Sequence, residues 1–150
     1  MIRFTLVAVF GLLACPAIAQ DSVGYAQMAK ATWSAFECSS LASKLKNPVE
    51  QERLFTFGYN QGKDFIAALQ AGKIEREDLS SIAPIGILAL LGGPSPIPDF
   101  MLGRIYEYAN QNALRGLSWE RNHFNTEEEQ QLAAYAKFSE RNCLLIGNGR

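Results

Sequence analysis

The feature that most constrains this chain is a pair of cysteines, Cys38 and Cys143, which lie about 105 residues apart. In an oxidising compartment, two cysteines in a small domain most often form a disulfide. A bridge across so long a loop stabilises the folded chain by about 4–5 kcal/mol in the chain-entropy model. That figure is comparable to the whole stability of a small domain, so the pairing decides how the fold is held together.

The N-terminal segment predicts that the chain reaches such a compartment. Arg3 precedes an apolar run of about eleven residues, and Ala17-Ile18-Ala19 then has the small-x-small pattern that signal peptidase reads. We therefore expect a signal peptide over residues 1–19 and, after cleavage near Ala19, a periplasmic or secreted protein. A lipid anchor on Cys15 is the alternative, because the residues before it resemble a lipobox.

The remaining segment, residues 20–150, is long enough for one domain and too short for two. The whole chain carries 14 basic and 15 acidic side chains without a basic stripe, so nucleic acid is not an expected partner. The N-terminal apolar run is too short to cross a bilayer. A second apolar stretch, from Ile82 to Leu91, is followed by prolines and glycines that a lipid environment does not tolerate. We expect no membrane span, and this stretch is either core or an exposed docking surface.

Local signals predict an all-α fold, a bundle of four to five helices in a single domain with one disulfide. Asn47 and Pro48 mark one helix start, since Asn47 can cap the helix and Pro48 can occupy its first position. Gly72 ends that helix because glycine adopts the left-handed conformation freely. Thr126-Glu127-Glu128-Glu129 is a capping box and starts the last helix. The expected helices cover about residues 22–45, 48–71, 84–91, 96–114 and 127–146.

Two weaker signals complete this outline. Asp21 or Ser22 is expected to cap the first helix, and Ser95 the fourth. The charged residues 73–78 are expected to form a connector.

Both cysteines are expected on buried helix faces. In the first helix, Cys38 recurs with Leu41 and Leu45 at intervals of three and four. In the last helix, the same spacing places Cys143 on one inward face with Leu132, Tyr135, Ala136, Ser139 and Ile146. A disulfide between the terminal helices fits this arrangement.

The chain lacks the side chains that most catalytic and metal sites need. His123 is the only histidine, so a zinc site of ordinary composition is not expected. Glu120 precedes it by three residues, the spacing of di-iron sites, but those sites need two such motifs. Ser95 lacks the Gly-x-Ser-x-Gly turn of a nucleophile elbow. We therefore expect no enzyme, no metal and no cofactor; an unfamiliar active site would need a deep polar pocket that holds Arg104, Glu107 and Tyr108.

The stretch FTFGYNQGK, from Phe55 to Lys63, has two glycines four residues apart on one face of the second expected helix. It lacks the spacing and the Ser/Thr of a phosphate-binding loop, and no strand precedes it. Each glycine costs a helix about 1 kcal/mol relative to alanine, so a close contact has to offset that cost. The contact is either a neighbouring helix or a partner protein. The candidate partner-binding residues are Gly58, Tyr59, Asn60, Gln61 and Gly62.

The segment from Gly58 to Gly62, with Cys38 before it and Cys143 closing the last helix, resembles the periplasmic immunity proteins against type VI secreted amidases, the Tai group. The resemblance covers about residues 33–69 and the last helix, and Phe57 stands where that group has a cysteine. It implies a helical, disulfide-bonded inhibitor of a cell-wall enzyme. A weaker resemblance is to HdeA-type acid-stress chaperones, which also have a tryptophan, here Trp33, near the first cysteine.

We therefore expect an exported protein without catalytic activity that binds another protein, in particular as an inhibitor or immunity protein of a cell-wall enzyme. One alternative is a periplasmic stress chaperone, which the apolar middle stretch favours. A structural protein without a catalytic role is the other alternative.

Overall fold

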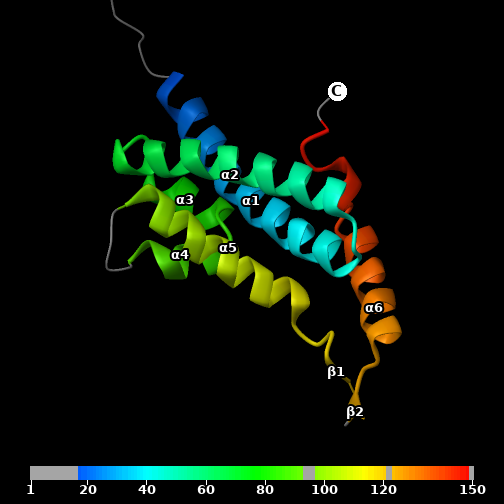
Figure 1. The fold of residues 1–150 in the computed structure, drawn as a ribbon. Coiled ribbons are helices and arrows are strands. Elements are labelled where there is room, and N and C mark those ends of the chain that lie inside the picture. Colours follow the sequence, from blue (N-terminus) through cyan, green and yellow to red (C-terminus); the bar gives the residue numbers. More distant parts are fainter. Residues whose placement is uncertain (1–16, 93–96, 121–122, 149–150) are drawn as a thin grey trace, which may run out of the picture.

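The computed structural model describes residues 17–92, 97–120 and 123–148. These residues form helices and one short hairpin, so the expected all-α fold is confirmed (Figure 1). Most of the expected signal peptide, Cys15 and the expected cap Ser95 lie outside the described residues. The elements are α1 (Ala17–Lys44), α2 (Pro48–Gln70), α3 (Arg76–Ile82), α4 (Ile85–Leu91), α5 (Pro98–Leu114), β1 (Trp119–Glu120), β2 (His123–Phe124), α6 (Glu127–Glu140) and the 3-10 helix η1 (Cys143–Leu145).

Helix α1 is the centre of the bundle. It contacts α2, α3, α5, α6 and η1. Helix α2 returns antiparallel beside α1, α3 and α4 lie near one end of the bundle, and α6 lies at the other (Figure 1). Strands β1 and β2 form an antiparallel hairpin between α5 and α6. None of the helices in the described ranges combines the length and the apolar character that crossing a membrane requires.

Several helix boundaries follow the local chemistry predicted from the sequence. The Asn47 side chain accepts a hydrogen bond from the backbone N–H of Glu50 at 3.2 Å, and Pro48 opens α2. Gly72, after the end of α2, has a φ of +66°. Thr126 and Glu129 form the predicted capping box of α6, in which each side chain accepts from the other residue's backbone N–H.

Helix α3 is a helix that the sequence did not predict, and it brings the described helices to six. It begins at Arg76, inside the segment expected to be a connector. The Ser22 hydroxyl donates to Asp78 Oδ2 at 2.6 Å and accepts from the backbone N–H of Glu75 at 2.9 Å. The predicted cap at Asp21 or Ser22 was therefore wrong: α1 starts earlier, at Ala17, and Ser22 instead binds the first turn of a helix more than fifty residues away.

Two hydrophobic clusters fill the bundle. The first joins α1, α2, α4 and α5 and includes Phe36, Phe65, Ile66, Ile87, Leu102 and Ile105. The second surrounds the disulfide and includes Leu41, Leu54, Leu117 and Phe138. Cys38 and Cys143 are both fully buried, with their Cα atoms 5.5 Å apart, so the predicted pairing is confirmed.

The apolar middle stretch is neither wholly core nor wholly surface. Helix α4 has the predicted extent, with Pro84 before it and Gly92 after it. Gly86 and Ile87 are buried, whereas Ile85 is 81% exposed. The ring of Trp33 occupies the space where a Cβ of Gly86 would lie, which fixes α4 against α1.

The buried face predicted for the last helix was wrong. Helix α6 ends at Glu140, and Asn142 then adopts a left-handed conformation with a φ of 52°. Cys143 therefore lies in η1, outside the period of α6. The residues of α6 that are buried are Ala134 and Phe138. The predicted inward residues Leu132 and Tyr135 are 71% and 61% exposed.

Candidate partner-binding site

The glycines of the predicted binding segment face the interior of the bundle. A Cβ on Gly58 would lie 3.0 Å from the Cβ of Ala35 and 2.9 Å from the Phe36 ring, both on α1. A Cβ on Gly62 would overlap the side chain of Leu102 on α5. Of the two contacts left open by the sequence, the helix–helix contact is the one that the structure places at these glycines.

The three residues between the glycines, Tyr59, Asn60 and Gln61, are less buried than the glycines. The Tyr59 hydroxyl donates to Asp99 Oδ1 at 3.3 Å, and its ring stacks on Phe55 at 6.3 Å between centroids. Gln61 is partly buried, and Asn60 is exposed. A partner can reach Asn60 and the outer edges of Tyr59 and Gln61, so a binding role for these three residues stays a prediction.

A groove of about 680 Å³ lies where the C-terminal end of α1 meets α6 and η1. We call it the α6–η1 groove. Among the residues that the structure describes, its lining is mostly apolar and includes no charged side chain. The polar lining residues are neutral: Asn47, Ser139 and Asn142. The apolar lining residues include Leu45, Phe138, Leu144 and Leu145.

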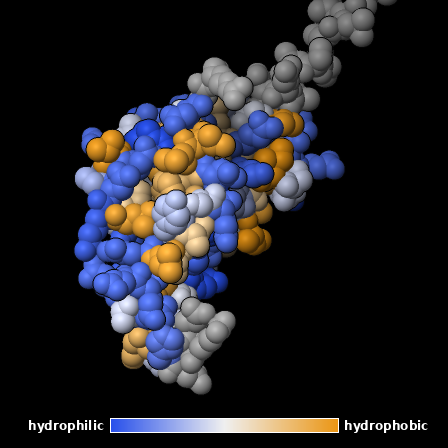
Figure 2. All heavy atoms as spheres, turned by 90° about the vertical axis from the view of Figure 1, so that its right-hand side faces the viewer, coloured by the Kyte–Doolittle hydropathy of each residue, from blue (hydrophilic) through white to orange (hydrophobic). Residues whose placement is uncertain are grey.

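Large apolar side chains around this groove reach the solvent. Leu144 and Leu145 are 59% and 71% exposed, and Tyr135, which also lines the groove, is 61% exposed. Leu132 precedes Tyr135 by one helical turn and is 71% exposed. On this side of the molecule, hydrophobic residues reach the surface among hydrophilic ones (Figure 2). The sequence missed this groove because the predicted face of the last helix turned Leu132 and Tyr135 inward.

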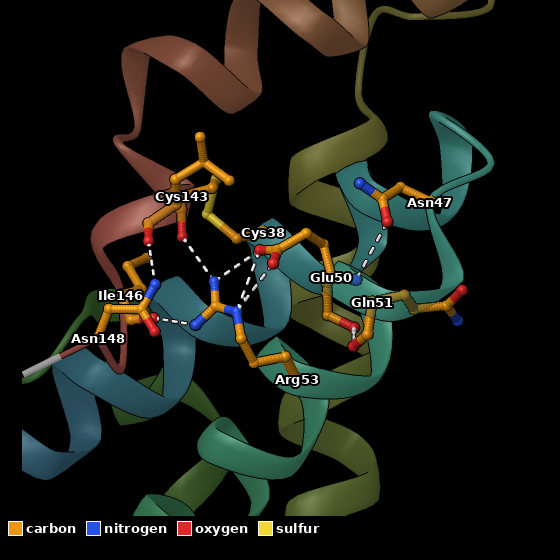
Figure 3. Close-up of polar contacts among 10 residues, drawn as sticks. Cys38, Asn47, Glu50, Gln51, Arg53, Cys143, Ile146 and Asn148 are labelled. Carbon is orange, nitrogen blue, oxygen red and sulfur yellow. Dashed lines mark hydrogen bonds and ion pairs between the residues drawn. A yellow bond between two sulfur atoms is a disulfide. The ribbon is translucent and has the colours of Figure 1, made fainter.

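A disulfide and the hydrogen bonds of Arg53 fix η1, which forms one side of the groove. The disulfide ties Cys143 to α1. The guanidinium of Arg53, on α2, donates to the backbone carbonyls of Cys143 and Ile146, as Figure 3 shows. Three further hydrogen bonds, of 2.7 to 3.1 Å, join this guanidinium to the carboxylate of Glu50. They hold the pKa of Glu50 below its usual value of 4.5.

Helix α6, the second side of the groove, is fixed by polar contacts with α1 and α5. Glu37, which is 7% exposed, accepts from Asn112 at 2.6 Å and from Arg141 at 3.4 Å. The ammonium of Lys137 donates to the backbone carbonyls of Ala113 and Arg115 where α5 ends, at 3.0 and 2.6 Å. Burial lowers the pKa of Lys137. Both sides of the groove are therefore held in place, one by the disulfide and Arg53 and the other by Glu37 and Lys137.

The residues named for an unfamiliar active site do lie together. Arg104, Glu107 and Tyr108 line one hollow of about 630 Å³ beside α5, but this hollow is open and mostly apolar, unlike a deep polar pocket. His123 is exposed in β2, with Nε2 4.0 Å from a Glu129 carboxylate oxygen. In the part of the chain that the structure describes, no three His, Cys, Asp or Glu side chains are grouped so that they could hold a metal ion.

No protein-family model, no curated protein and no solved structure matches this chain. The resemblances to amidase immunity proteins and to HdeA-type chaperones stay predictions that rest on the segment from Gly58 to Gly62, on Trp33 and on the two cysteines.

Proposed function

We propose that this chain is an exported protein without catalytic activity that binds a protein partner through the α6–η1 groove. The observation that carries the proposal is the groove itself, whose described lining residues are uncharged and include large apolar side chains that remain mostly in solvent. Burying one leucine side chain is worth about 1.5–3 kcal/mol. Leu144 and Leu145 line the groove and remain mostly exposed after folding, so a partner that buries them gains this free energy on binding.

The groove has the composition of a protein-binding surface. Protein interfaces have an apolar centre surrounded by polar groups, and charged residues are depleted at that centre. Here Leu144 and Leu145 stand near the neutral polar groups of Asn47 and Ser139. The disulfide and Arg53 hold η1 in place before binding, so little conformational entropy has to be lost on association. The partner that fits is a protein segment with bulky, uncharged side chains, such as the apolar face of an amphipathic helix.

Inhibition of a cell-wall enzyme is the specific form of this proposal. It is supported by the resemblance of the segment from Gly58 to Gly62 and of the cysteine pair to the amidase immunity proteins. In that form, the partner's apolar segment belongs to an enzyme that acts in the same compartment. The exposed Asn60 and the outer edge of Tyr59 supply a second contact region on α2.

Site-specific photocrosslinking in the cell tests the proposal. A photoreactive phenylalanine analogue replaces Leu145 in one variant and Ile85 in a control. Ile85 is a suitable control because it is 81% exposed, lies on α4 and does not line the groove. We expect one discrete crosslinked adduct from position 145 and none of the same mass from position 85. In addition, Leu145→Asp should abolish copurification of that partner, whereas Ile85→Asp should leave it unchanged.

The outcomes separate the alternatives. An adduct pattern that is the same at positions 145 and 85, or no adduct at position 145, contradicts binding through the groove. A broad distribution of adducts that forms only between about pH 2 and 4 supports the stress-chaperone alternative instead.

A further inference from the structure

Gly103 is a glycine that the packing of the described residues does not explain. It lies within α5 and is exposed, and among the residues that the structure describes no side chain or other element comes within 4 Å of the position its Cβ would take. Glycine is the least favourable residue in a helix interior apart from proline. Gly58, Gly62 and Gly86 are different, because α1, α5 or the Trp33 ring occupies the space beside each. At Gly103, the described residues of one copy supply no close contact that would account for a glycine.

The surface around Gly103 is concave and exposes aromatic side chains. The hollow of about 630 Å³ already described is centred on α5 and extends to Leu90 at the end of α4. We call it the Gly103 hollow. Two of its aromatic residues, Phe100 and Tyr108, are 48% and 45% exposed. Tyrosine and arginine are among the residues that contribute most to binding energy at protein interfaces.

The Gly103 hollow contains both positive and negative side chains, so two copies of it can pair opposite charges. Asp99 and Glu107 supply carboxylates, and Arg104 lies between them in the sequence. The guanidinium of Arg104 lies 6.0 Å from the Phe100 ring centre and donates to the Leu90 carbonyl at 3.3 Å. These contacts hold the cation between α4 and α5, among the residues that line the hollow.

We propose that two copies of this chain associate through the Gly103 hollow, with their α5 helices antiparallel and crossing next to Gly103. In a two-fold interface, each contact between residue i of one copy and residue j of the other occurs twice, so a glycine at the helix crossing leaves room for the facing side chain of the other copy. Reversing one helix about an axis between positions 103 and 104 brings Arg104 of each copy over Gly103 of the other. In this position, Arg104 of one copy lies beside the Phe100 ring and the Glu107 carboxylate of the other copy. The two-fold symmetry repeats the same contact with the two copies exchanged.

The charge pattern favours a second copy over an unrelated partner. A second copy brings a carboxylate to each Arg104 and a cation to each Glu107, so every charge in this contact has its counterpart within the same sequence. The Gly103 hollow lies on α4 and α5, away from α6 at the other end of the bundle (Figure 1). A dimer formed in this way leaves both α6–η1 grooves open, so the inference does not depend on the proposed function.

A pair of glycine variants separates association from helix stability. Gly103→Ala should raise the melting temperature of the dilute protein by about 3 °C, because alanine favours helix and nothing obstructs its methyl group. The same change should weaken self-association about tenfold, as measured by sedimentation velocity over a concentration series, because the methyl group lies at the helix crossing. Gly24→Ala is the matched control: Gly24 lies in α1 and also has no atom within 4 Å of its Cβ position. It should give a similar thermal gain with unchanged association.

A charge exchange tests the second copy directly. Arg104→Glu alone and Glu107→Arg alone should each abolish dimers, because each puts like charges opposite one another twice. An equimolar mixture of the two variants should restore dimers that contain one copy of each, detected by native mass spectrometry. A wild-type chain that stays monomeric at about millimolar concentration overturns the proposal. It is equally overturned if Gly103→Ala leaves association unchanged, or if the mixture of charge variants stays monomeric.

Discussion

Removal of the Cys38–Cys143 disulfide is expected to lower the free energy of unfolding by about 4.8 kcal/mol at 25 °C. The bridge spans a sequence separation of 105 residues. In the chain-entropy model, closing a loop of that length removes about 16 cal/mol/K from the unfolded chain, which gives this free energy. A domain of this size has a total stability of about 5–15 kcal/mol, so the reduced protein is expected to be close to its unfolding threshold.

Urea unfolding of the oxidised and the reduced wild-type protein measures this difference. Comparing two redox states of one sequence avoids the cavities that Cys38→Ala and Cys143→Ala would leave, since both thiols are fully buried. The bonds from Arg53 to the carbonyls of Cys143 and Ile146 do not involve the sulfur atoms, so we expect them to remain in the reduced protein. The native state should therefore keep the position of η1, and the stability change should come from the unfolded chain.

Two results would refute this reasoning. A difference in unfolding free energy below about 1 kcal/mol would show that the long loop does not constrain the unfolded chain as the model assumes. Modification of both thiols by a maleimide in denaturant without reductant would show that Cys38 and Cys143 are not paired in the protein.

Two further changes test the packing and the electrostatics. Gly86→Ala should lower the free energy of unfolding by about 1–3 kcal/mol, because the new methyl group would overlap the Trp33 ring; a variant as stable as wild type in urea would contradict this contact. Glu50→Gln should cost about 0.5 kcal/mol near pH 7, where the Glu50–Arg53 pair is intact. Because the pKa of Glu50 is lowered in the folded state, its contribution is present above pH 4.5 and is lost as the pH falls below that value. Urea unfolding at pH 7 and pH 3 should therefore show a gap between wild type and variant that shrinks on acidification, and a constant gap would exclude the ion pair as its source.

Helix boundaries could be predicted because their causes are local. The cap at Asn47, the left-handed Gly72 and the capping box at Thr126 each depend on residues within four positions. No information about the rest of the fold is needed to place them. The structure confirms all three.

The face of α6 could not be predicted in the same way. Counting back from Cys143 at helical spacing turns Leu132 and Tyr135 toward the core. That count assumes that one helix continues to the cysteine, but the left-handed Asn142 breaks the period two residues after α6 ends. The disulfide then fixes Cys143 independently of the rotation of α6. The α6–η1 groove exists because of this break, so no periodicity in the sequence indicates it.

The sequence alone determined the helical class, the disulfide pair and the requirement for a close contact at Gly58 and Gly62. These follow from composition, cysteine number and glycine propensity, none of which depends on what lies nearby in space. Only the tertiary structure decided that Ala35 and Phe36 of α1 supply the contact at Gly58, and that Ser22 binds the start of α3. Contacts of this kind join residues that are more than twenty positions apart. The period of one helix fixes which residues share its face, but the neighbour of that face depends on how all the helices pack together.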